Sequence, residues 1–366
     1  MSTIVGVGMF GLPYVGARSG FSITIVFLLF LTIIITTVHL LYGEIVCRTK
    51  GRHRLVGYAE HYLGHWGKRI VTISVVVGFY GSLLVYIILG GNFLYLLFLP
   101  FLKIPLIFFN LIFFIIGAIA VYGGLRVITK IDFLMGILLI VVVFLFFFLG
   151  FKQIKIENLK TLDFHNFFLP YGAILYSLAG LSAIPEIKEI FSHKENGLYK
   201  KSIFWGTLIP AILYFVFILT IIGLTGSGTT EDAVSGLTSL LGEKIILLGA
   251  FFGFLATITS FFSLGLSLKE TFICDYKINK NIAWFLVCFV PLVLFGLGFY
   301  NFVTIIVLTG ALIGAVEGTS IVLIYKKVKE IGARCADYNL KIPNVLNYII
   351  VSVFIIGFIC TLIFTL

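Results

Sequence analysis

The feature that most constrains this chain is a series of apolar runs, each about as long as a bilayer is thick and each bounded by charge, proline or glycine. A transmembrane helix needs about 20 mainly apolar residues. The chain has 366 residues, 60% of them hydrophobic and 11% charged, which is enough apolar sequence for about eleven such helices. Because a soluble domain carries about 25% charged residues, the sequence predicts an all-α integral membrane protein.

The expected spans follow one another along the whole chain, with short connections between them. They fall at 2–17, 21–46, 69–99, 104–123, 130–151, 167–190, 202–224, 244–268, 281–299, 301–325 and 346–366. An odd number of spans places the two termini on opposite sides of the membrane. In the connection 47–68 we expect a short amphipathic helix at the interface, rather than a metal or proton site built on its histidines.

Basic residues are concentrated in the connections on one side. If the N-terminus is cytoplasmic, twenty of the 26 Lys and Arg residues lie in inside connections and six in outside ones. Short cytoplasmic loops carry an excess of Lys and Arg, so the sequence predicts a protein of the cell membrane with its N-terminus inside and its C-terminus outside. The same asymmetry accounts for the formal net charge of +10, with the lipid bilayer as the partner and no nucleic acid.

Catalytic and metal sites are not indicated. The five cysteines are scattered, odd in number and without CxxC spacing. No Ser/His/Asp, HExxH or paired-carboxylate arrangement stands at one membrane depth. Gly6, Gly8 and Gly11 match the GxGxxG pattern, but that fingerprint follows a strand, whereas this stretch lies within an apolar span. We therefore expect neither an enzyme nor a bound cofactor or metal.

Two spans contain helix-breaking residues. The first carries three glycines and Pro13 within eight residues, and the sixth carries small residues at 179–183 followed by Pro185 and Glu186. Unpaired backbone at membrane depth is tolerated only where it is buried in protein or lines a watery cavity. For the first span alone, a glycine face for helix packing with a proline kink fits equally well.

Interrupted segments at corresponding places in two halves indicate the midplane site of a transporter. Residues 1–151 and 167–326 would then be inverted repeats of five helices each, and 346–366 an added helix. Free N–H groups at half-helix N-termini favour a carboxylate, and free carbonyls favour an ammonium or a metal cation. Such a site binds a small zwitterionic amino acid without any catalytic side chain.

Four short motifs carry a family resemblance: GMFGLPY at 8–14, HLLYGE at 39–44, YIILGG at 86–91 and SAIPE at 182–186. The chain resembles the amino acid permeases of the amino acid–polyamine–organocation superfamily, especially the aromatic and hydrophobic amino acid permeases and the amino acid/auxin permeases. The resemblance covers essentially the whole chain. It implies about eleven spans on a LeuT-type fold with a 5+5 inverted repeat, broken helices one and six and an extra C-terminal helix.

The resemblance also implies which residues bind the substrate. The main-chain groups of the amino acid would contact the two breaks, and a hydroxyl from Ser182 would add to them. Tyr86 on the third span would face the site, unless it is a packed or interfacial tyrosine. The implied substrate residues are Val7, Gly8, Met9, Gly11, Tyr86, Ala179, Gly180, Leu181 and Ser182.

The coupling ion is either Na⁺ or H⁺. In sodium-coupled relatives the segment resembling Ala256, Thr259 and Ser260 supplies oxygen ligands together with first-span carbonyls, here those of Ile4 and Val7. The alternative is that these hydroxyls bond back to their own helix. For H⁺ the candidate carriers are Glu186, Glu317 and Glu44, since ionisable residues within a membrane are functional candidates; for Glu44 the alternative is an ion pair with Arg48 one turn on.

The expected function is that of a secondary active transporter that moves amino acids, hydrophobic or aromatic ones, by ion-coupled alternating access. Glycines of the third and tenth spans either leave room for a substrate side chain or form helix contacts: Gly81, Gly90, Gly91, Gly310, Gly314 and Gly318. The competing hypothesis is an amino-acid-sensing receptor on the same fold, like the spore germinant receptors. Family members also carry residues before the first break, so the resemblance implies a truncated or misassigned N-terminus.

Overall fold

The computed structural model describes residues 4–51, 53–124, 128–191, 197–274, 276–331 and 338–365. Within these ranges the secondary structure is helical throughout, with short 3-10 turns in the connections and no strand. Eight helical segments there are long and apolar enough to cross a membrane by length and composition. The predicted all-α membrane fold is confirmed.

The helices correspond closely to the expected spans. Their bounds are α1 (Gly8–Ser19), α2 (Phe21–Arg48), α3 (Leu55–Phe98), α4 (Leu106–Gly123), α5 (Ile128–Gly150), α6 (Leu169–Ser177), α7 (Ala183–Ile190), α8 (Leu198–Thr225), α9 (Thr238–Leu241), α10 (Glu243–Cys274), α11 (Lys280–Gly296), α12 (Phe302–Ile313), α13 (Thr319–Ile331) and α14 (Asn344–Thr365). The sixth span is divided into α6 and α7. The tenth is divided into α12 and α13 by a π-helical turn at Gly314–Gly318.

The third span is longer than the sequence suggested. Helix α3 begins at Leu55 and bends at Gly64, whose φ of 74° lies in the left-handed region that glycine tolerates. The helical residues 55–63 before the bend are the short helix expected within 47–68, while its place at the membrane interface stays a prediction. Because of the bend, residues 55–63 run in a different direction from the span that follows them.

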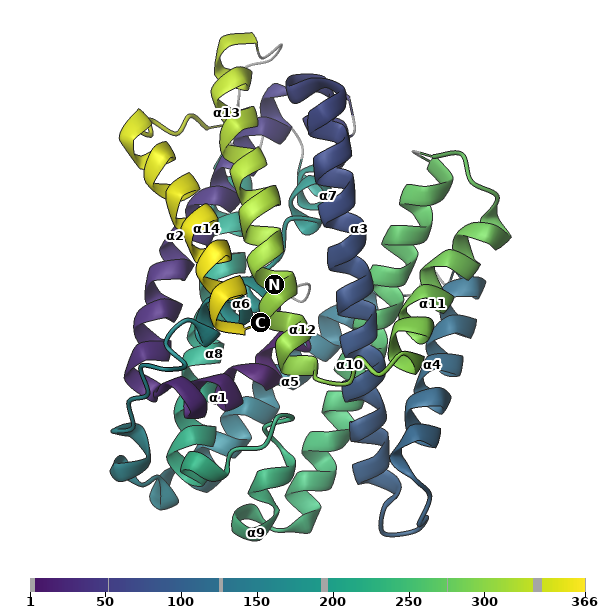
Figure 1. The fold of residues 1–366 in the computed structure, drawn as a ribbon, viewed down its shortest axis with the longest axis vertical. Helices are drawn as coiled ribbons and strands as arrows, with labels where there is room; N and C mark the ends of the chain where they lie inside the picture. The colour runs from purple at the N-terminus through teal and green to yellow at the C-terminus, as the bar shows by residue number, and fades with distance from the viewer. Residues whose placement is uncertain are drawn as a thin grey trace.

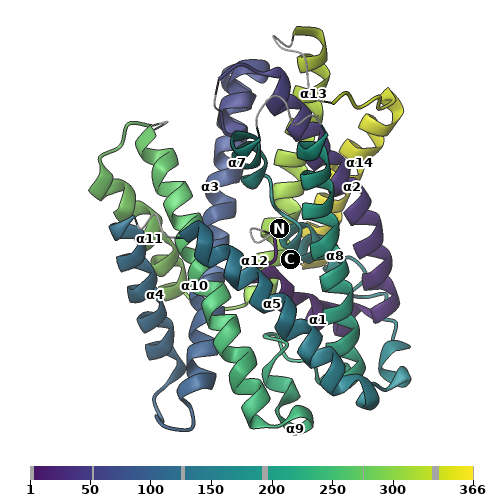
Figure 2. The ribbon, with the colours of Figure 1, turned by 180° about the vertical axis from the view of Figure 1, so that it is seen from behind.

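The helices form two flanks around the divided sixth span. Helices α3, α4, α10 and α11 pack together on the right of Figure 1, while α2, α13 and α14 lie on the left. Helix α5 crosses the back of the molecule against α10 and α8, as Figure 2 shows. Between the flanks, α6 packs on α1, α2 and α12, which places both predicted breaks at the centre.

Glycines let several helices approach closely. Gly90 packs against the ring of Phe113 on α4, and Gly310 packs against the backbone carbonyl of Gly172 on α6. The other glycines proposed as side-chain room in the third and tenth spans also face neighbouring side chains. They are helix contacts of the kind that small residues make in membrane proteins, so the packing alternative is correct for them.

Candidate functional site

The first span is unwound at its start. Residues 4–7 have no helical assignment, and α1 begins only at Gly8. The carbonyls of Gly6 and Val7 accept tight turn bonds from the N–H groups of Met9 and Phe10, at 3.2 and 3.1 Å. The glycine-rich stretch is therefore a break, as predicted, whereas Pro13 lies inside the helix that follows.

The sixth span breaks between Ser177, where α6 ends, and Ala183, where α7 begins. Within the described chain, no hydrogen-bond partner is recorded for the backbone N–H groups of Gly180, Leu181 and Ser182. Unpaired N–H groups before a helix start, together with the helix dipole, attract anions. The second break thus offers a site suited to a carboxylate.

The two breaks pack directly on each other through one glycine from each. A β-carbon on Gly8 would lie 2.6 Å from Ser177 Oγ and 2.9 Å from Ser177 Cα. A β-carbon on Gly180 would lie 2.5 Å from Ile4 Cγ1. The contact of Gly8 is with backbone, which cannot move aside, so the close approach of the breaks requires glycine at position 8, whereas at Gly180 the Ile4 side chain would have to move.

A cavity of about 160 Å³ lies where the breaks meet. Its walls come from both breaks, from α3, from one face of α10 and from the π-helical turn. The hydroxyl-bearing side chains that line it are Tyr42, Ser82, Tyr86, Tyr176, Ser177, Ser182, Ser260, Ser267 and Thr271. The cavity therefore combines free backbone groups with hydroxyls and a largely apolar wall, as small-molecule sites do.

The cavity is open toward one end of the molecule. It extends to Arg54, which is exposed and directly precedes α3. The first turns of α3 lie at the upper end of Figure 1. There Arg54 forms an ion pair of 3.0 Å with Glu186 on α7. In the other direction Phe10 packs edge-to-face on Phe93 and Phe217, at centroid distances of 4.9 and 6.0 Å, and all three rings are buried. Access to the breaks is thus one-sided.

Most of the proposed site residues line this cavity, and some do not. Those in its wall are Ile4, Val7, Gly8, Tyr86, Ala179, Gly180, Leu181, Ser182, Ser260 and Glu317. Met9 is buried outside the wall, and Gly11 packs against Ile306 and Phe302 of α12. Ala256 and Thr259 also lie outside it: Ala256 is one turn before Ser260 on α10, beyond the residues that form the wall.

Comparison with known proteins assigns the family. Residues 1–361 match the tryptophan/tyrosine permease family. The chain belongs to this family. A tyrosine-specific transport system of Haemophilus influenzae is 28% identical over 284 residues, which cover 73% of this chain and 70% of the relative. A glutamine transporter of Aliivibrio fischeri is 22% identical over 320 residues, covering 85% and 82%.

Solved structures give the same fold at low identity. MhsT, crystallised with L-phenylalanine, superposes with a TM-score of 0.65 at 17% identity, over 99% of this permease and 95% of that chain. The inward-facing Mhp1 superposes with a TM-score of 0.69 at 14% identity, over 100% and 87%. The LeuT-type fold is confirmed. The family assignment makes this permease an amino acid transporter, and the receptor alternative is not favoured.

Glu317 is the buried carboxylate of the cavity wall. It lies in the π-helical turn, is 8% exposed, and accepts a long hydrogen bond of 3.5 Å from Ser74. Among the described residues, no Lys, Arg or His forms an ion pair with it. A π-turn adds a residue to the helix and is frequent at functional sites; here it is the turn that presents the carboxylate to the cavity.

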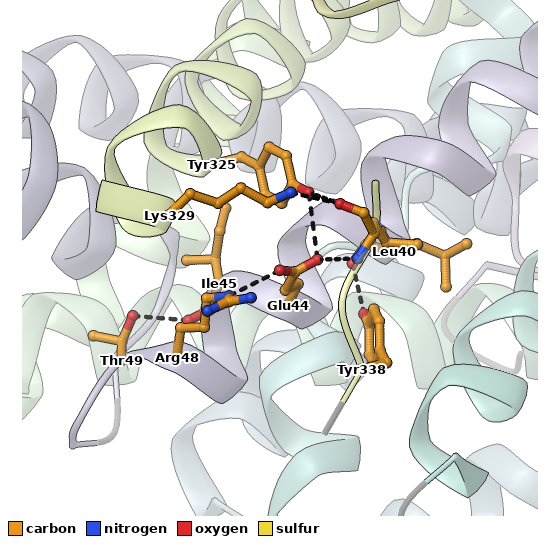
Figure 3. Close-up of polar contacts among 9 residues, drawn as sticks. Leu40, Glu44, Ile45, Arg48, Thr49, Tyr325, Lys329 and Tyr338 are labelled. Carbon is orange, nitrogen blue, oxygen red and sulfur yellow. Dashed lines mark hydrogen bonds and ion pairs between the residues drawn. The ribbon is translucent and has the colours of Figure 1, made fainter. Parts of the chain in front are cut away.

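Glu44 has a different environment, shown in Figure 3. It is fully buried, pairs with Arg48 at 2.8 Å, and accepts bonds from the Leu340 N–H at 2.8 Å and the Tyr325 hydroxyl at 3.4 Å. Tyr325 and Lys329 in turn donate to the Leu340 carbonyl. The expected pair with Arg48 is confirmed, and Glu44 fastens the segment before α14 to α2, outside the cavity wall.

Some of the oxygen atoms proposed to bind sodium already form hydrogen bonds within the protein. The Thr259 hydroxyl donates to the Ala256 carbonyl at 3.2 Å, which is the bonding back to the helix considered above. The Ile4 carbonyl accepts a bond of 2.6 Å from the Tyr214 hydroxyl. Ser260 remains directed to the break, since a β-carbon on Gly6 would lie 3.6 Å from its Oγ.

Sequence reasoning missed several side chains at the site. Tyr176, at the end of α6, packs its ring next to Gly8 and places its buried hydroxyl beside Ser82 and Tyr86. Ser82 and Tyr86 are one helical turn apart on α3, a spacing that puts them on one face. That spacing was visible in the sequence, whereas the arrival of Tyr176 opposite them depends on the fold.

Proposed function

We propose that this permease is a secondary active transporter of aromatic amino acids in the cytoplasmic membrane. It works by alternating access between the repeats 1–151 and 167–326, within the amino acid–polyamine–organocation superfamily. The observation that carries the proposal is that two helix breaks meet at one cavity with access from a single side. A transporter needs a central site that faces one side at a time.

The backbone of the breaks recognises the main chain of the amino acid. The N–H groups of Gly180, Leu181 and Ser182 donate to the carboxylate. The ammonium lies near the carbonyls of Gly6 and Val7, each of which keeps a lone pair beyond its turn bond. Every amino acid carries this carboxylate and this ammonium, whatever its side chain. This part of the site therefore binds any amino acid.

The substrate side chain lies toward Tyr86, Tyr176 and Ser82. Their aromatic rings and hydroxyls suit a phenol or an indole, which combines an apolar ring with one polar atom. The family description, the tyrosine-specific relative and the phenylalanine complex of MhsT support an aromatic substrate. Another relative is a glutamine transporter, so uptake of both aromatic amino acids and glutamine must be measured to identify the preferred substrate side chain.

The coupling ion is H⁺, carried by Glu317. This carboxylate is buried in the cavity wall without an ion pair among the described residues, whereas Glu44 pairs with Arg48 and Glu186 with Arg54. Ionisable residues inside a membrane are functional candidates, and this one reaches the cavity. Na⁺ bound by Val7 and Ser260 is the second candidate, supported by the approach of Ser260 to the first break.

The distribution of basic residues supports an N-terminus inside the cell. In that orientation the end of the cavity at Arg54 faces the cytoplasm, and the arrangement described here is open inward. The aromatic cluster around Phe10 then closes the outward path.

Uptake into proteoliposomes tests the proposal. Labelled tyrosine, tryptophan, phenylalanine and glutamine are offered with an imposed proton gradient, an imposed sodium gradient, or neither. Accumulation of the aromatic amino acids driven by the proton gradient is expected. Accumulation driven only by sodium would replace H⁺ with Na⁺, and saturable binding without accumulation under any gradient would refute a secondary transporter.

A further inference from the structure

A row of hydroxyls on α8 follows the divided sixth span. Tyr199, Thr207 and Tyr214 are separated by eight and seven residues, about two helical turns each, so they share one face. The Tyr199 hydroxyl donates to the Ile184 carbonyl of α7 at 3.0 Å. Thr207 bonds His39 at 2.8 Å, and His39 lies beside Gly180 in the second break. Helix α8 thus contacts α7 after the break through Tyr199, and α2 beside the break through Thr207.

Tyr214 is the member of the row that reaches both breaks. Its hydroxyl lies 2.6 Å from the Ile4 carbonyl of the first break and 2.9 Å from the Ser177 carbonyl at the end of α6. The side chain is fully buried. A tyrosine hydroxyl has a single hydrogen, so the two carbonyls share one donor.

Both carbonyls depend on this donor. Unwound backbone leaves carbonyls without their helical N–H partners, and a buried polar group without a partner is unfavourable. At membrane depth, water reaches such groups only through the cavity. Tyr214 itself is absent from the cavity wall, so its hydroxyl bonds the breaks from behind, on the side away from the substrate.

We propose that Tyr214 is a positioning residue that fastens the two breaks to each other, so that both halves of the backbone site keep one relative geometry. The Tyr214 hydroxyl holds the carbonyl of Ile4 next to that of Ser177, and these residues also make the two glycine contacts between the breaks. Without the hydroxyl, the carboxylate and ammonium subsites would vary in separation.

Tyr214→Phe removes the hydroxyl and keeps the ring, and Tyr171→Phe is the matched control. Tyr171 is also a buried tyrosine whose hydroxyl lies near two carbonyls, at 3.1 and 3.4 Å, but these belong to Val353 and Phe354 of α14. Each variant therefore loses one buried hydroxyl that lies near two backbone carbonyls. Only the first loses the connection between the breaks.

Hydrogen–deuterium exchange tests the connection without any substrate. The Phe10 amide bonds the Val7 carbonyl of the first break, and the Leu178 amide bonds the Ile174 carbonyl in the last turn of α6, next to the second break. In Tyr214→Phe, peptides that contain either amide should exchange about tenfold faster. In Tyr171→Phe both should exchange as in the wild type. A change at one break only, equal changes in both variants, or faster exchange throughout the protein would overturn the proposal.

Binding of labelled tyrosine gives the second measurement and depends on the proposed function. The dissociation constant should rise about tenfold in Tyr214→Phe, in line with the loss of one buried donor, and stay within about twofold in Tyr171→Phe. If the wild type binds no aromatic amino acid, the proposed substrate is wrong, while the exchange measurement still decides the role of Tyr214. Equal affinity of wild type and Tyr214→Phe would contradict the positioning role.

Discussion

Gly8 lies against the backbone of Ser177, so closely that the first break touches the end of α6 without an intervening side chain. A β-carbon on Gly8 would come within 2.9 Å of Ser177 Cα. Backbone cannot yield to such a contact as the end of a flexible side chain can. The separation of the two breaks is therefore set by glycine at this position, and the size of the site depends on it.

We expect Gly8→Ala to reduce tyrosine uptake by at least tenfold, because the added methyl group forces the breaks apart. Overpacking of this kind also costs about 1–3 kcal/mol of stability. Gly296→Ala is the control, since a β-carbon there meets no atom within 4 Å. Initial uptake rates and melting temperatures of the purified variants test this, and normal uptake by Gly8→Ala would contradict it.

Glu317→Gln is expected to abolish accumulation driven by a proton gradient while retaining exchange of labelled for unlabelled tyrosine. The amide has nearly the size of the carboxyl group but carries no titratable proton, so the substrate site should survive. Counterflow and gradient-driven uptake in the same proteoliposomes separate the two activities. Glu60→Gln serves as the control, because that carboxylate pairs with Lys68 outside the cavity wall. Intact proton-driven uptake in Glu317→Gln would exclude this residue as the carrier.

Glu44→Ala should lower the stability of the permease by about 3–5 kcal/mol, because it leaves the charge of Arg48 and the Leu340 N–H without their buried partner. Glu60→Ala breaks a 2.9 Å pair with Lys68 at partly exposed positions and should lower the stability far less, because exposed ion pairs contribute little. Melting curves in detergent compare the two. Equal losses would show that the Glu44 network does not hold α14 to α2.

The ion pair between Arg54 and Glu186 connects α7 to the start of α3 at the open end of the cavity. Both side chains are exposed, so neither single substitution should cost more than about 1 kcal/mol. We expect reversal of either charge to slow uptake, and the double reversal of Arg54→Glu with Glu186→Arg to restore it. Initial rates for the two single variants and the double variant decide the matter, and a double variant slower than both would argue against a direct pair.

Tyr176→Phe is expected to lower the preference for tyrosine over phenylalanine by roughly tenfold, because a site that bonds a substrate hydroxyl discriminates against the analogue that lacks it. Competition of each amino acid against labelled tryptophan measures the preference. An unchanged ratio would place the substrate ring away from Tyr176.

The membrane fold was largely predictable because it depends on local composition. Apolar runs of span length form helices wherever they occur in lipid, and clustered glycine and proline marked both breaks correctly. The sequence did not reveal that Pro13 would lie inside α1, or that Met9 and Gly11 would face away from the cavity. Those outcomes depend on how α1 is rotated about its axis against α12 and α6. Hydrophobic periodicity does not specify this rotation in a span that is apolar all round.

The chemistry of single side chains was harder to predict than the breaks. Glu44, Glu186 and Glu317 look alike as acids near apolar runs, and only their partners separate them. Arg48 is one turn from Glu44 and was foreseen, whereas Arg54 comes to Glu186 from 132 residues away. Tyr214 gave no signal, since its importance comes from two carbonyls that the chain brings together only after folding.

The buried rings of Phe10, Phe93 and Phe217 influence which conformation the empty permease adopts between transport cycles. For the cavity to open in the opposite direction, Phe10 at the start of α1 must leave contacts that are each worth about 0.5–1.5 kcal/mol. In the proposed transport cycle, these two contacts favour the arrangement described here by about 1–3 kcal/mol of aromatic packing. A smaller residue at Phe93 would shift the resting population, and transport assays would register this as altered apparent affinity even though the binding groups themselves are unchanged.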